Sequence, residues 1–321
     1  MLLAVENLKM YYGVDGETVK AVDGVDFSLG EAESLGIVGE SGCGKSSLAM
    51  TLLKILPSNA RIVSGRIVLD GMDIVGLPED KLRREIRWRK VSMVFQGSMN
   101  ALNPVIKVGE QIAEAIIVHV DGIAKKEALE KAADLLEMVG LDRSTLKRYP
   151  FELSGGQRQR AVIAMALALN PRVLIADEPT TALDVIVQAQ ILKLLKELKE
   201  RLRLSIVFIS HDVSVISEVS NKVAIMYAGK FVESGSTEAV FLNPSHPYTQ
   251  ALISAVPSIK EPKKTFKYIV GQPPSLINPP SGCRFHPRCP YVMDVCRSEE
   301  PPSVEVEKEH FAACHLLGEY A

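Results

Sequence analysis

The chain has 321 residues, of which 47% are hydrophobic, with 37 Lys and Arg against 39 Asp and Glu. This length and composition favour about two folded domains and exclude a disordered or fibrous chain, and the net charge of -2 argues against a protein that coats nucleic acid. Residues 1–6 carry no basic segment and the longest apolar run is 161–169, so we expect neither a signal peptide nor a membrane span.

The first part of the chain predicts alternating strands and helices. Residues 34–38 are a short apolar strand that runs into a glycine-rich turn, and the apolar spacing of 45–56 predicts a helix that ends before Pro57. Residues 65–71 predict a strand that ends in an Asp-Gly hairpin turn. An antiparallel element therefore accompanies the α/β part.

The loop at 39–46 matches the phosphate-loop pattern of Gly, four residues, Gly, Lys and Ser or Thr. Its glycines let successive backbone N–H groups converge on an anion, and the helix start adds its positive dipole end. We expect Lys45 to reach the outer phosphates of a nucleotide and Ser46 to ligate Mg²⁺, while Cys43 contributes only its backbone. The predicted nucleotide-binding residues here are Gly39, Ser41, Gly42, Cys43, Gly44, Lys45, Ser46 and Ser47.

The middle of the chain is predicted to be helical. The β pattern fades over 103–150, and 125–139 repeat apolar residues at helical spacing, so we expect an inserted helical subdomain at about 98–160. Ser154 is a suitable N-cap for a helix from near Arg158, and the glycines after Ser154 expose backbone amides. A helix N-terminus of this kind favours phosphate, so the chain carries a second predicted anion site.

Two carboxylates follow the apolar strand predicted at 173–176. Because adjacent residues on a strand point to opposite sides, we expect Asp177 and Glu178 to have different roles. Asp177 is the candidate for holding Mg²⁺, directly or through water, and Glu178 for orienting and polarising an attacking water. A helix at 185–202 and a strand at 206–209 follow.

The pentapeptide at 153–157, Leu-Ser-Gly-Gly-Gln, resembles the signature of ATP-binding cassette (ABC) ATPases, and residues 1–235 resemble that family throughout. The resemblance implies an α/β phosphate-loop NTPase fold over 1–240, with a mixed sheet, an antiparallel β subdomain and the inserted helical subdomain. It also implies a head-to-tail pair, in which the signature of one subunit closes over the nucleotide held by another. The signature residues predicted to bind nucleotide are Ser154, Gly155, Gly156 and Gln157.

The same resemblance assigns roles to two further polar residues. Gln96, after an apolar strand at 91–95, matches the family's glutamine loop, which senses the metal and γ-phosphate. His211 matches the switch histidine, which contacts the γ-phosphate and supports Glu178. The predicted catalytic residues are Lys45, Gln96, Glu178 and His211, and the predicted Mg²⁺ ligands are Ser46, Gln96 and Asp177.

Two more nucleotide contacts come from the resemblance alone. Asp184, in the sequence Ala-Leu-Asp, matches the loop through which the paired subunits communicate. Tyr12 resembles the aromatic residue that stacks on adenine, and Tyr11 competes for this role because the register is uncertain by one residue.

The chain changes character after Gly235. Eight prolines in quick succession make a helix through this stretch improbable and predict a linker followed by a small loop-rich domain, at 241–321. Residues 243–249 resemble the extension of ATPase subunits from oligopeptide and dipeptide importers, which narrows the substrate class. The prolines are Pro244, Pro247, Pro257, Pro262, Pro273, Pro274, Pro279 and Pro280.

Four of the five cysteines, Cys283, Cys289, Cys296 and Cys314, lie within 283–314. An ATP-using domain belongs in the cytosol, where disulfides are disfavoured, so clustered thiols favour a metal site. No close cysteine pair of the zinc-knuckle type occurs, so the spacing favours a [4Fe-4S] cluster, with zinc or free thiols as alternatives. His286 and His315 are possible substitute ligands, and Arg284, Arg288 and Arg297 could offset the negative charge of a cluster.

The sequence thus predicts an ATP hydrolase that drives import of dipeptides or oligopeptides from the cytoplasmic face of the membrane, as a peripheral subunit. The implied partners are a second ATPase subunit, identical or paralogous, two transmembrane permease subunits and, indirectly, an extracellular or periplasmic substrate-binding protein, with no nucleic acid. Related importers of nickel or glycosides remain alternatives. A soluble cassette ATPase of DNA repair or translation is a rival, although the segment 96–153 is too short for a long coiled-coil arm. A cassette governed by a redox-sensing cluster is a second rival.

Overall fold

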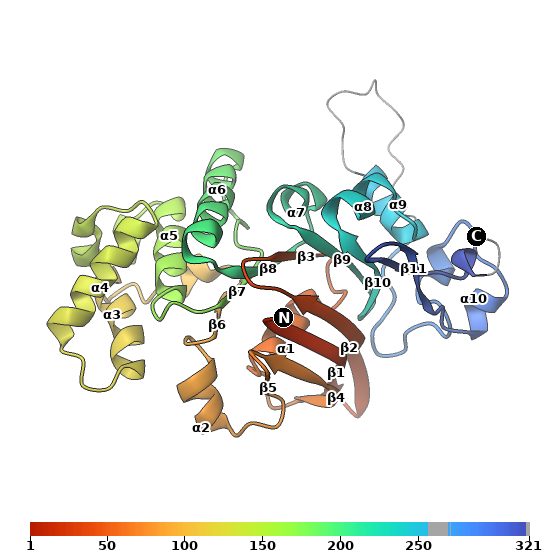
Figure 1. Cartoon of the computed structure of the whole chain (residues 1–321), viewed down its shortest axis with the longest axis horizontal. Helices are drawn as coiled ribbons and strands as arrows, with labels where there is room; N and C mark the ends of the chain where they lie inside the picture. The colour runs from red at the N-terminus through yellow and green to blue at the C-terminus, as the bar shows by residue number, and fades with distance from the viewer. Residues whose placement is uncertain (256–268, 270, 319–321) are drawn as a thin grey trace. The chain divides into compact units, whose positions relative to one another are not determined.

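In the computed structural model, which describes residues 1–255, 269 and 271–318, the chain divides into two units. Met1–Val75 and Phe208–Ala321 make the first unit, and Gly76–Val207 makes the second. Figure 1 traces the elements of both. Of the prolines behind the predicted linker, Pro257 and Pro262 lie outside the described residues. The predicted domains 1–240 and 241–321 stay a prediction.

An antiparallel sheet occupies part of the first unit. Strands β1 (Leu3–Val14), β2 (Glu17–Leu29), β4 (Ala60–Leu69) and β5 (Met72–Asp73) lie in the order β2-β1-β4-β5. The Asp-Gly pair between β4 and β5 has φ angles of 53° and 76°, and Leu69 pairs with Met72 across it. The predicted hairpin turn is therefore confirmed, since two successive positive φ values are what a type I′ turn requires.

The other strands of the first unit form a mixed sheet. Strand β3 (Ser34–Val38) pairs in parallel with β9 (Lys222–Tyr227), and β10 (Lys230–Ser236) is antiparallel to β9. Strand β12 (His310–Ala313) continues the sheet on β10, and β11 (Ser303–Glu307) pairs with β12. All five residues of β3 are buried, as expected of a parallel strand covered on both faces. The C-terminal segment, by which we mean the described residues after position 240, thus adds β11 and β12 to this sheet.

Helix α1 (Lys45–Leu52) follows the phosphate loop and ends four residues before the predicted end at residue 56. Lys54 adopts a φ of 50°, its N–H donates to Thr51 O at 2.9 Å, and the N–H of Ile55 donates to Met50 O at 3.0 Å. These two bonds are the Schellman pattern that closes a helix at a left-handed residue. The apolar spacing continues past this point, which is why the prediction was too long.

The remaining helices of the first unit are short: α7 (Val213–Val219), α8 (Thr237–Leu242), α9 (Pro247–Ser254) and α10 (Val295–Ser298). The prolines argued against a helix through the proline-rich stretch, and the short helix α9 begins at one of them. Pro247 occupies the first helical position, where a missing N–H costs nothing, and the His246 side chain caps the helix by accepting from Tyr248 N at 3.0 Å.

The second unit contains a pair of parallel strands and most of the long helices. Strands β6 (Val91–Val94) and β7 (Val173–Asp177) are adjacent, with Val94 opposite Ala176, so their carboxyl ends lie at one edge. Strand β8 (Ser205–Ser210) begins in this unit and ends in the first. A short helix, α2 (Glu79–Lys81), precedes a π-helical turn at Leu82–Ile86.

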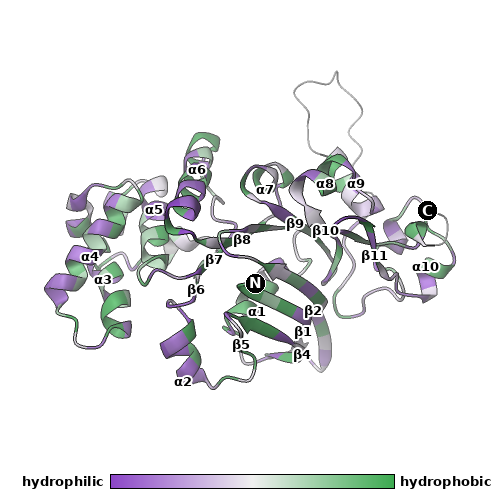
Figure 2. Ribbon diagram, viewed as in Figure 1, coloured by the Kyte–Doolittle hydropathy of each residue, from purple (hydrophilic) through white to green (hydrophobic). Residues whose placement is uncertain are grey.

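Helices α3 (Val108–His119), α4 (Lys125–Met138), α5 (Gly155–Ala166) and α6 (Val185–Leu202) complete this unit. Helix α4 alternates between purple and green in Figure 2, as a helix with one apolar face does, and α3 packs beside it in Figure 1. The predicted bounds of α6 are confirmed. Within the described residues, no helix is both long enough and apolar enough to cross a membrane. Short 3₁₀ turns occur at Ser98–Asn100, Arg143–Lys147, Pro150–Glu152, His286–Arg288 and His315–Leu317.

Candidate nucleotide site

The phosphate loop lies between β3 and α1 in the first unit, as predicted. A Cβ on Gly44, whose φ is 111°, would lie 2.0 Å from Ala21 O, and a Cβ on Gly39 would lie 2.1 Å from Met226 O. The two glycines therefore let the loop pack directly against the backbone of neighbouring segments. Gly42 has a φ of 79° and open space around it, so it serves the turn itself. The glycines are therefore needed for close packing as well as for the exposure of backbone amides that the sequence predicted.

Lys45 is bound by the loop that precedes it. Its ammonium Nζ donates to Gly39 O at 2.7 Å and to Glu40 O at 2.9 Å, and lies 3.7 Å from the Sγ of Cys43. Burial raises the pKa of the Cys43 thiol, although the neighbouring ammonium acts in the opposite direction. The loop carbonyls thus satisfy a lysine that is only 6% exposed, which keeps a buried positive charge at the anion site.

Tyr11 and Tyr12 line the same pocket of about 370 Å³ but have different partners. The Tyr12 hydroxyl donates to the Ser47 Oγ at 3.0 Å, just after the phosphate loop. The Tyr11 hydroxyl donates to Asp23 at 2.6 Å, and burial together with that bond raises the pKa of Tyr11 to about 12. Both hydroxyl groups are thus engaged, and the assignment of Tyr12 rather than Tyr11 to an aromatic contact with a base stays a prediction.

In the second unit, Glu178 follows β7 and is held by two hydrogen bonds. Its Oε2 accepts from the Gln96 Nε2 at 2.9 Å and from the Thr181 Oγ1 at 2.9 Å. Glu178 has a φ of 46°, which is unusual for a residue with a side chain and is typical of functional sites. The preceding Asp177 is buried at the strand end, with 2% of its surface exposed. The structure thus brings Gln96 and Glu178 together at the carboxyl ends of β6 and β7.

Ser154 caps α5, as predicted, although the helix begins at Gly155 rather than near Arg158. Its Oγ accepts from Gln157 N at 3.3 Å, and Gln157 Oε1 accepts from Ser154 N at 3.0 Å, which is a capping box. A Cβ on Gly156 would lie 2.7 Å from the Cγ1 of Val187 in α6, so glycine is required for this packing. The amides of Gly155 and Gly156 remain at the start of the helix, where an anion is favoured.

The predicted site residues are divided between the units. The phosphate loop, Tyr12 and His211 lie in the first unit, and His211 is an exposed residue immediately after β8. Asp184 lies in the second unit, where its carboxylate caps α6 by accepting from Val187 N at 2.9 Å. This cap is a role that the sequence did not predict for Asp184.

The described residues contain no group of three or more His, Cys, Asp or Glu side chains arranged to hold a metal ion, so the structure does not support the predicted metal site. Burial, with a smaller effect of the nearby thiols in the same direction, raises the pKa of Cys283 to about 11. None of the five cysteines is in a disulfide. The four C-terminal thiols are not arranged as metal ligands. They are Cys283, Cys289, Cys296 and Cys314.

Two of the three arginines expected to offset the charge of a cluster have carboxylate partners, and the expected role itself stays a prediction. Arg284 forms an ion pair with Asp23 and donates to Ala228 O, and Arg288 forms an ion pair with Glu40. These pairs join residues 248 or more positions apart in the sequence, so no local pattern indicated them. Glu40 is a phosphate-loop residue that sequence reasoning left without a role.

The predicted Mg²⁺ site needs other ligands than the predicted cysteine site, because Mg²⁺ commonly binds one or two carboxylates together with phosphate oxygens and water. Ser46 in α1 offers a hydroxyl oxygen, and Asp177 at the end of β7 offers a carboxylate. Both are oxygen ligands of the type that Mg²⁺ accepts. The chemistry of the loop therefore suits MgATP.

Comparison with known families gives two matches. The family described as ABC transporter matches residues 22–181, and the family described as oligopeptide/dipeptide transporter, C-terminal region, matches residues 232–296.

Similar sequences extend over the full chain. The chain is 44% identical over 320 residues to the dipeptide transport ATP-binding protein DppD of Caldanaerobacter subterraneus subsp. tengcongensis, which covers 99% of this chain and 98% of that protein. It is also 44% identical over 315 residues to the oligopeptide transport ATP-binding protein OppD of Escherichia coli, which covers 98% of this chain and 92% of that protein.

Solved structures resemble the cassette part. One is the dimeric post-hydrolysis state of an ATP-binding cassette bound to ADP and Pi, with a TM-score of 0.65 and 29% identity, covering 74% of this chain and 99% of that one. Another is CbiO1 from Clostridium perfringens, part of an ABC transporter complex, with a TM-score of 0.64 and 28% identity, covering 75% of this chain and 91% of that one.

Proposed function

This chain belongs to the family of ABC transporter ATPases, and we propose that it is the ATP-hydrolysing subunit of an importer for dipeptides or oligopeptides. The observation that carries the proposal is the 44% identity to DppD and OppD over almost the whole length of each chain. The match of residues 232–296 to the oligopeptide/dipeptide transporter C-terminal region supports the same substrate class. Nickel and glycosides are the competing cargoes.

The proposal assigns the chemistry to residues already described. Lys45 and the loop amides bind the outer phosphates, while Ser46, Gln96 and Asp177 serve as the ligands or water-mediated partners of Mg²⁺. Glu178 orients the water that attacks the γ-phosphate in line, and His211 supports Glu178. The hydrogen bond from Gln96 to Glu178 supports this assignment, because it holds the carboxylate in one position.

The proposal also includes the assembly. Two ATPase subunits pair head to tail, with Ser154, Gly155, Gly156 and Gln157 of one chain closing on the nucleotide bound by the other. The pair sits peripherally on the cytoplasmic face of the membrane, against two permease subunits that receive cargo from a substrate-binding protein. Support comes from the relatives DppD and OppD, which are transport ATP-binding proteins. The similar cassette structure bound to ADP and Pi is a dimer, which supports the pairing.

The Glu178→Gln variant tests the chemistry. We expect it to bind MgATP as tightly as wild type and to accumulate a closed dimer, while turnover falls by a factor of at least about 100, because the amide cannot accept a proton from water. The matched control is Glu200→Gln, which changes an exposed carboxylate on α6. Turnover that is equal in Glu178→Gln and wild type would refute the role of Glu178.

Uptake by the assembled complex tests the cargo. The chain is purified with its permeases, reconstituted in vesicles, and offered a panel of dipeptides, oligopeptides, nickel and glycosides. Uptake of peptides that requires ATP supports the proposal, and uptake of nickel or glycosides without peptides refutes it. Stimulation of ATP hydrolysis by nucleic acid or ribosomes, with no permease bound, would instead favour the rival soluble ATPase.

We further propose that Cys283, Cys289, Cys296 and Cys314 bind a [4Fe-4S] cluster, with Zn²⁺ as the alternative. The support is their spacing and the mutual influence of their thiols, and binding requires rearrangement because no ligand set is preformed in the described chain. Metal analysis of anaerobically purified protein, with Cys283→Ser and the control Cys43→Ala, tests this. Iron and labile sulfide that disappear only in Cys283→Ser support the cluster, and metal-free protein refutes it.

A further inference from the structure

Arg288 contacts the side chain of Glu40, the second residue of the phosphate loop. Its Nη1 lies 2.6 Å from Glu40 Oε2 and its Nη2 lies 3.0 Å from Glu40 Oε1, so the pair is bidentate. The Arg288 side chain is 5% exposed and that of Glu40 is 23% exposed. An ion pair this well covered differs from a surface pair, because solvent screens it less and its geometry is fixed.

The surroundings of Arg288 hold it in this position. Its guanidinium lies over the Tyr227 ring at 5.8 Å from the centroid, and Nη1 donates to the Tyr227 hydroxyl at 3.3 Å. Nη2 also donates to the backbone carbonyls of Ile269 and Gly271, at 3.4 and 3.3 Å. The hydrogen bonds to Glu40 raise the pKa of Arg288 above its ordinary value. The arginine is thus held in place by Tyr227 of β9 together with the backbone of residues 269 and 271.

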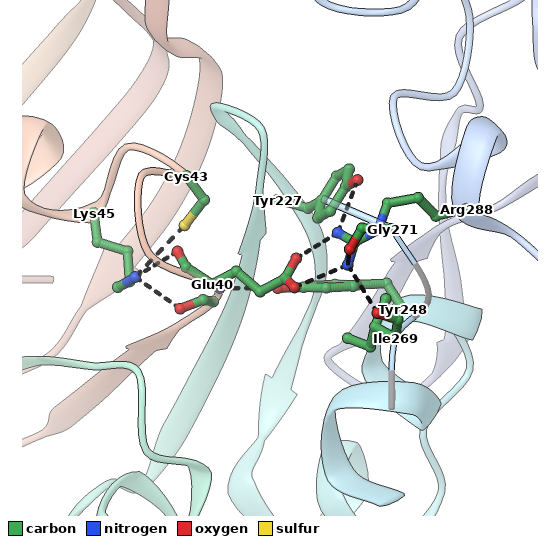
Figure 3. Close-up of polar contacts among 9 residues, drawn as sticks. Glu40, Cys43, Lys45, Tyr227, Tyr248, Ile269, Gly271 and Arg288 are labelled. Atoms are coloured by element: carbon green, nitrogen blue, oxygen red, sulfur yellow. Dashed lines mark hydrogen bonds and ion pairs between the residues drawn. The ribbon is translucent and has the colours of Figure 1, made fainter. Parts of the chain in front are cut away.

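Glu40 is tied to the fold from its backbone as well. Its N–H donates to the hydroxyl of Tyr248, a fully buried residue of α9, at 3.0 Å. Its carbonyl accepts from the Lys45 ammonium at 2.9 Å. Figure 3 shows Glu40 between Lys45 on one side and Tyr248 and Arg288 on the other. Residues after position 240 therefore contact the phosphate loop through both the backbone and the side chain of Glu40.

Arg284, four residues before Arg288, makes a second contact of the same kind. It forms a buried ion pair with Asp23 and donates to Ala228 O. Burial raises the pKa of Asp23, but the Tyr11 hydrogen bond and the Arg284 charge outweigh burial and lower it overall. Asp23 is therefore ionised when paired. Two arginines of one short segment thus neutralise two carboxylates of the nucleotide-binding part.

The position of Glu40 gives this pairing a consequence for ATP. A phosphate loop attracts anions through its amides, its lysine and the helix dipole, and a carboxylate on the same loop repels them. Arg288 cancels that repulsion and holds the carboxylate to one side. Without Arg288, the uncompensated charge of Glu40 would act on the phosphates.

We propose that Arg288 is a positioning residue for MgATP, through which the C-terminal segment sets the affinity of the phosphate loop. The inference rests on the proposed ATPase function. It assigns the Arg288–Glu40 pair to nucleotide affinity and not to the hydrolysis step. The extension after residue 240 is thereby a working part of the nucleotide site as well as an extension of the sheet.

Equilibrium binding of MgATP to full-length variants tests the proposal. Removal of the compensating charge in Arg288→Gln should raise the Kd on the order of tenfold, whereas Glu40→Gln/Arg288→Gln should return to within about threefold of wild type. Arg288→Lys keeps the charge but not the bidentate geometry, so its Kd should lie between wild type and Arg288→Gln. The matched control is Arg297→Gln, an exposed arginine of the same segment, which should bind as wild type does.

The recovery of affinity in the double variant separates an electrostatic role from a structural one. If Arg288 only stabilised the fold, both variants would melt at lower temperature and the double variant would bind no better than Arg288→Gln, which would overturn the inference. An unchanged Kd in Arg288→Gln would overturn it as well. If Arg288→Gln does not fold, the Kd of Arg288→Lys against wild type decides in the same way. Wild-type protein that binds no MgATP would refute the proposed function itself, which distinguishes the two failures.

Discussion

His246 is a buried, neutral histidine whose protonation should destabilise the chain in mild acid. It is 1% exposed, its Nδ1 accepts from Tyr248 N at 3.0 Å, and its Nε2 is buried without a hydrogen-bond partner. The groups that face it are Glu233, whose Oε2 accepts from His246 N at 2.9 Å, and His310, which contacts Glu233 at 2.8 Å. Burial lowers the pKa of His246 from 6.5 to about 4.

The sign of the pH effect follows from the direction of this shift. Between the unfolded pKa of 6.5 and the folded value of about 4, the unfolded chain binds a proton that the folded chain does not. The stability that depends on neutral His246 is therefore fully present above the unfolded pKa of 6.5, and it is lost as the pH falls toward the folded pKa of about 4. The loss due to His246 between pH 7 and pH 5 is about 2 kcal/mol, and it approaches about 3 kcal/mol below pH 4.

Chemical denaturation at pH 7 and pH 5 measures this contribution against His246→Asn. Asparagine retains an N-cap acceptor for Tyr248 N but has no titratable group, while Glu233 and His310 are present in both chains. We expect wild type to lose about 2 kcal/mol more than the variant, or about 4 to 8 °C in Tm for a unit of this size. Equal losses in the two chains would show that His246 is not held neutral by burial.

Two further predictions concern the nucleotide site. Gln96→Ala removes one of the two hydrogen bonds that hold Glu178, so kcat should fall on the order of tenfold at an unchanged Tm. Steady-state ATPase assays would detect this fall, and an unchanged kcat would contradict the positioning role of Gln96. Gly44→Ala places a methyl group 2.0 Å from a backbone carbonyl, so it should lower the free energy of unfolding by about 3 kcal/mol and abolish ATP binding. Gly42→Ala has open space around it and should lower the free energy of unfolding by only about 1 kcal/mol. Comparable unfolding free energies for the two alanine variants would show that close packing is not what requires Gly44.

Local chemistry made most of the cassette elements predictable. The strand at 34–38 and the helix at 185–202 agree with the structure to the residue, because a short apolar run and a helical repeat each depend only on neighbours. The Ser154 cap and the Asp-Gly turn were predictable for the same reason. The predicted end of α1 was wrong, because the apolar repeat continues past the point where Lys54 takes a left-handed backbone conformation and ends the helix.

The proline-rich stretch and the cysteine-rich segment show the limit of such reasoning. Proline density argued against a helix through this stretch but did not indicate the short helix α9, which begins at Pro247 with a cap from His246. Cysteine spacing predicted a metal site, but the described thiols are not arranged as one. The spacing of residues along the chain shows which side chains could take part in a site, but it does not determine how those side chains are oriented.

The phosphate loop, the two carboxylates after 173–176 and the helix-capping signature can be recognised from the amino-acid sequence, because each is a contiguous pattern whose chemistry is local. The contacts of Gln96 with Glu178 and of Arg288 with Glu40 depend on how the chain folds in three dimensions. These contacts join residues 82 and 248 positions apart. No local pattern encodes such a distance, since strand pairing and the packing of the C-terminal segment bring these residues together.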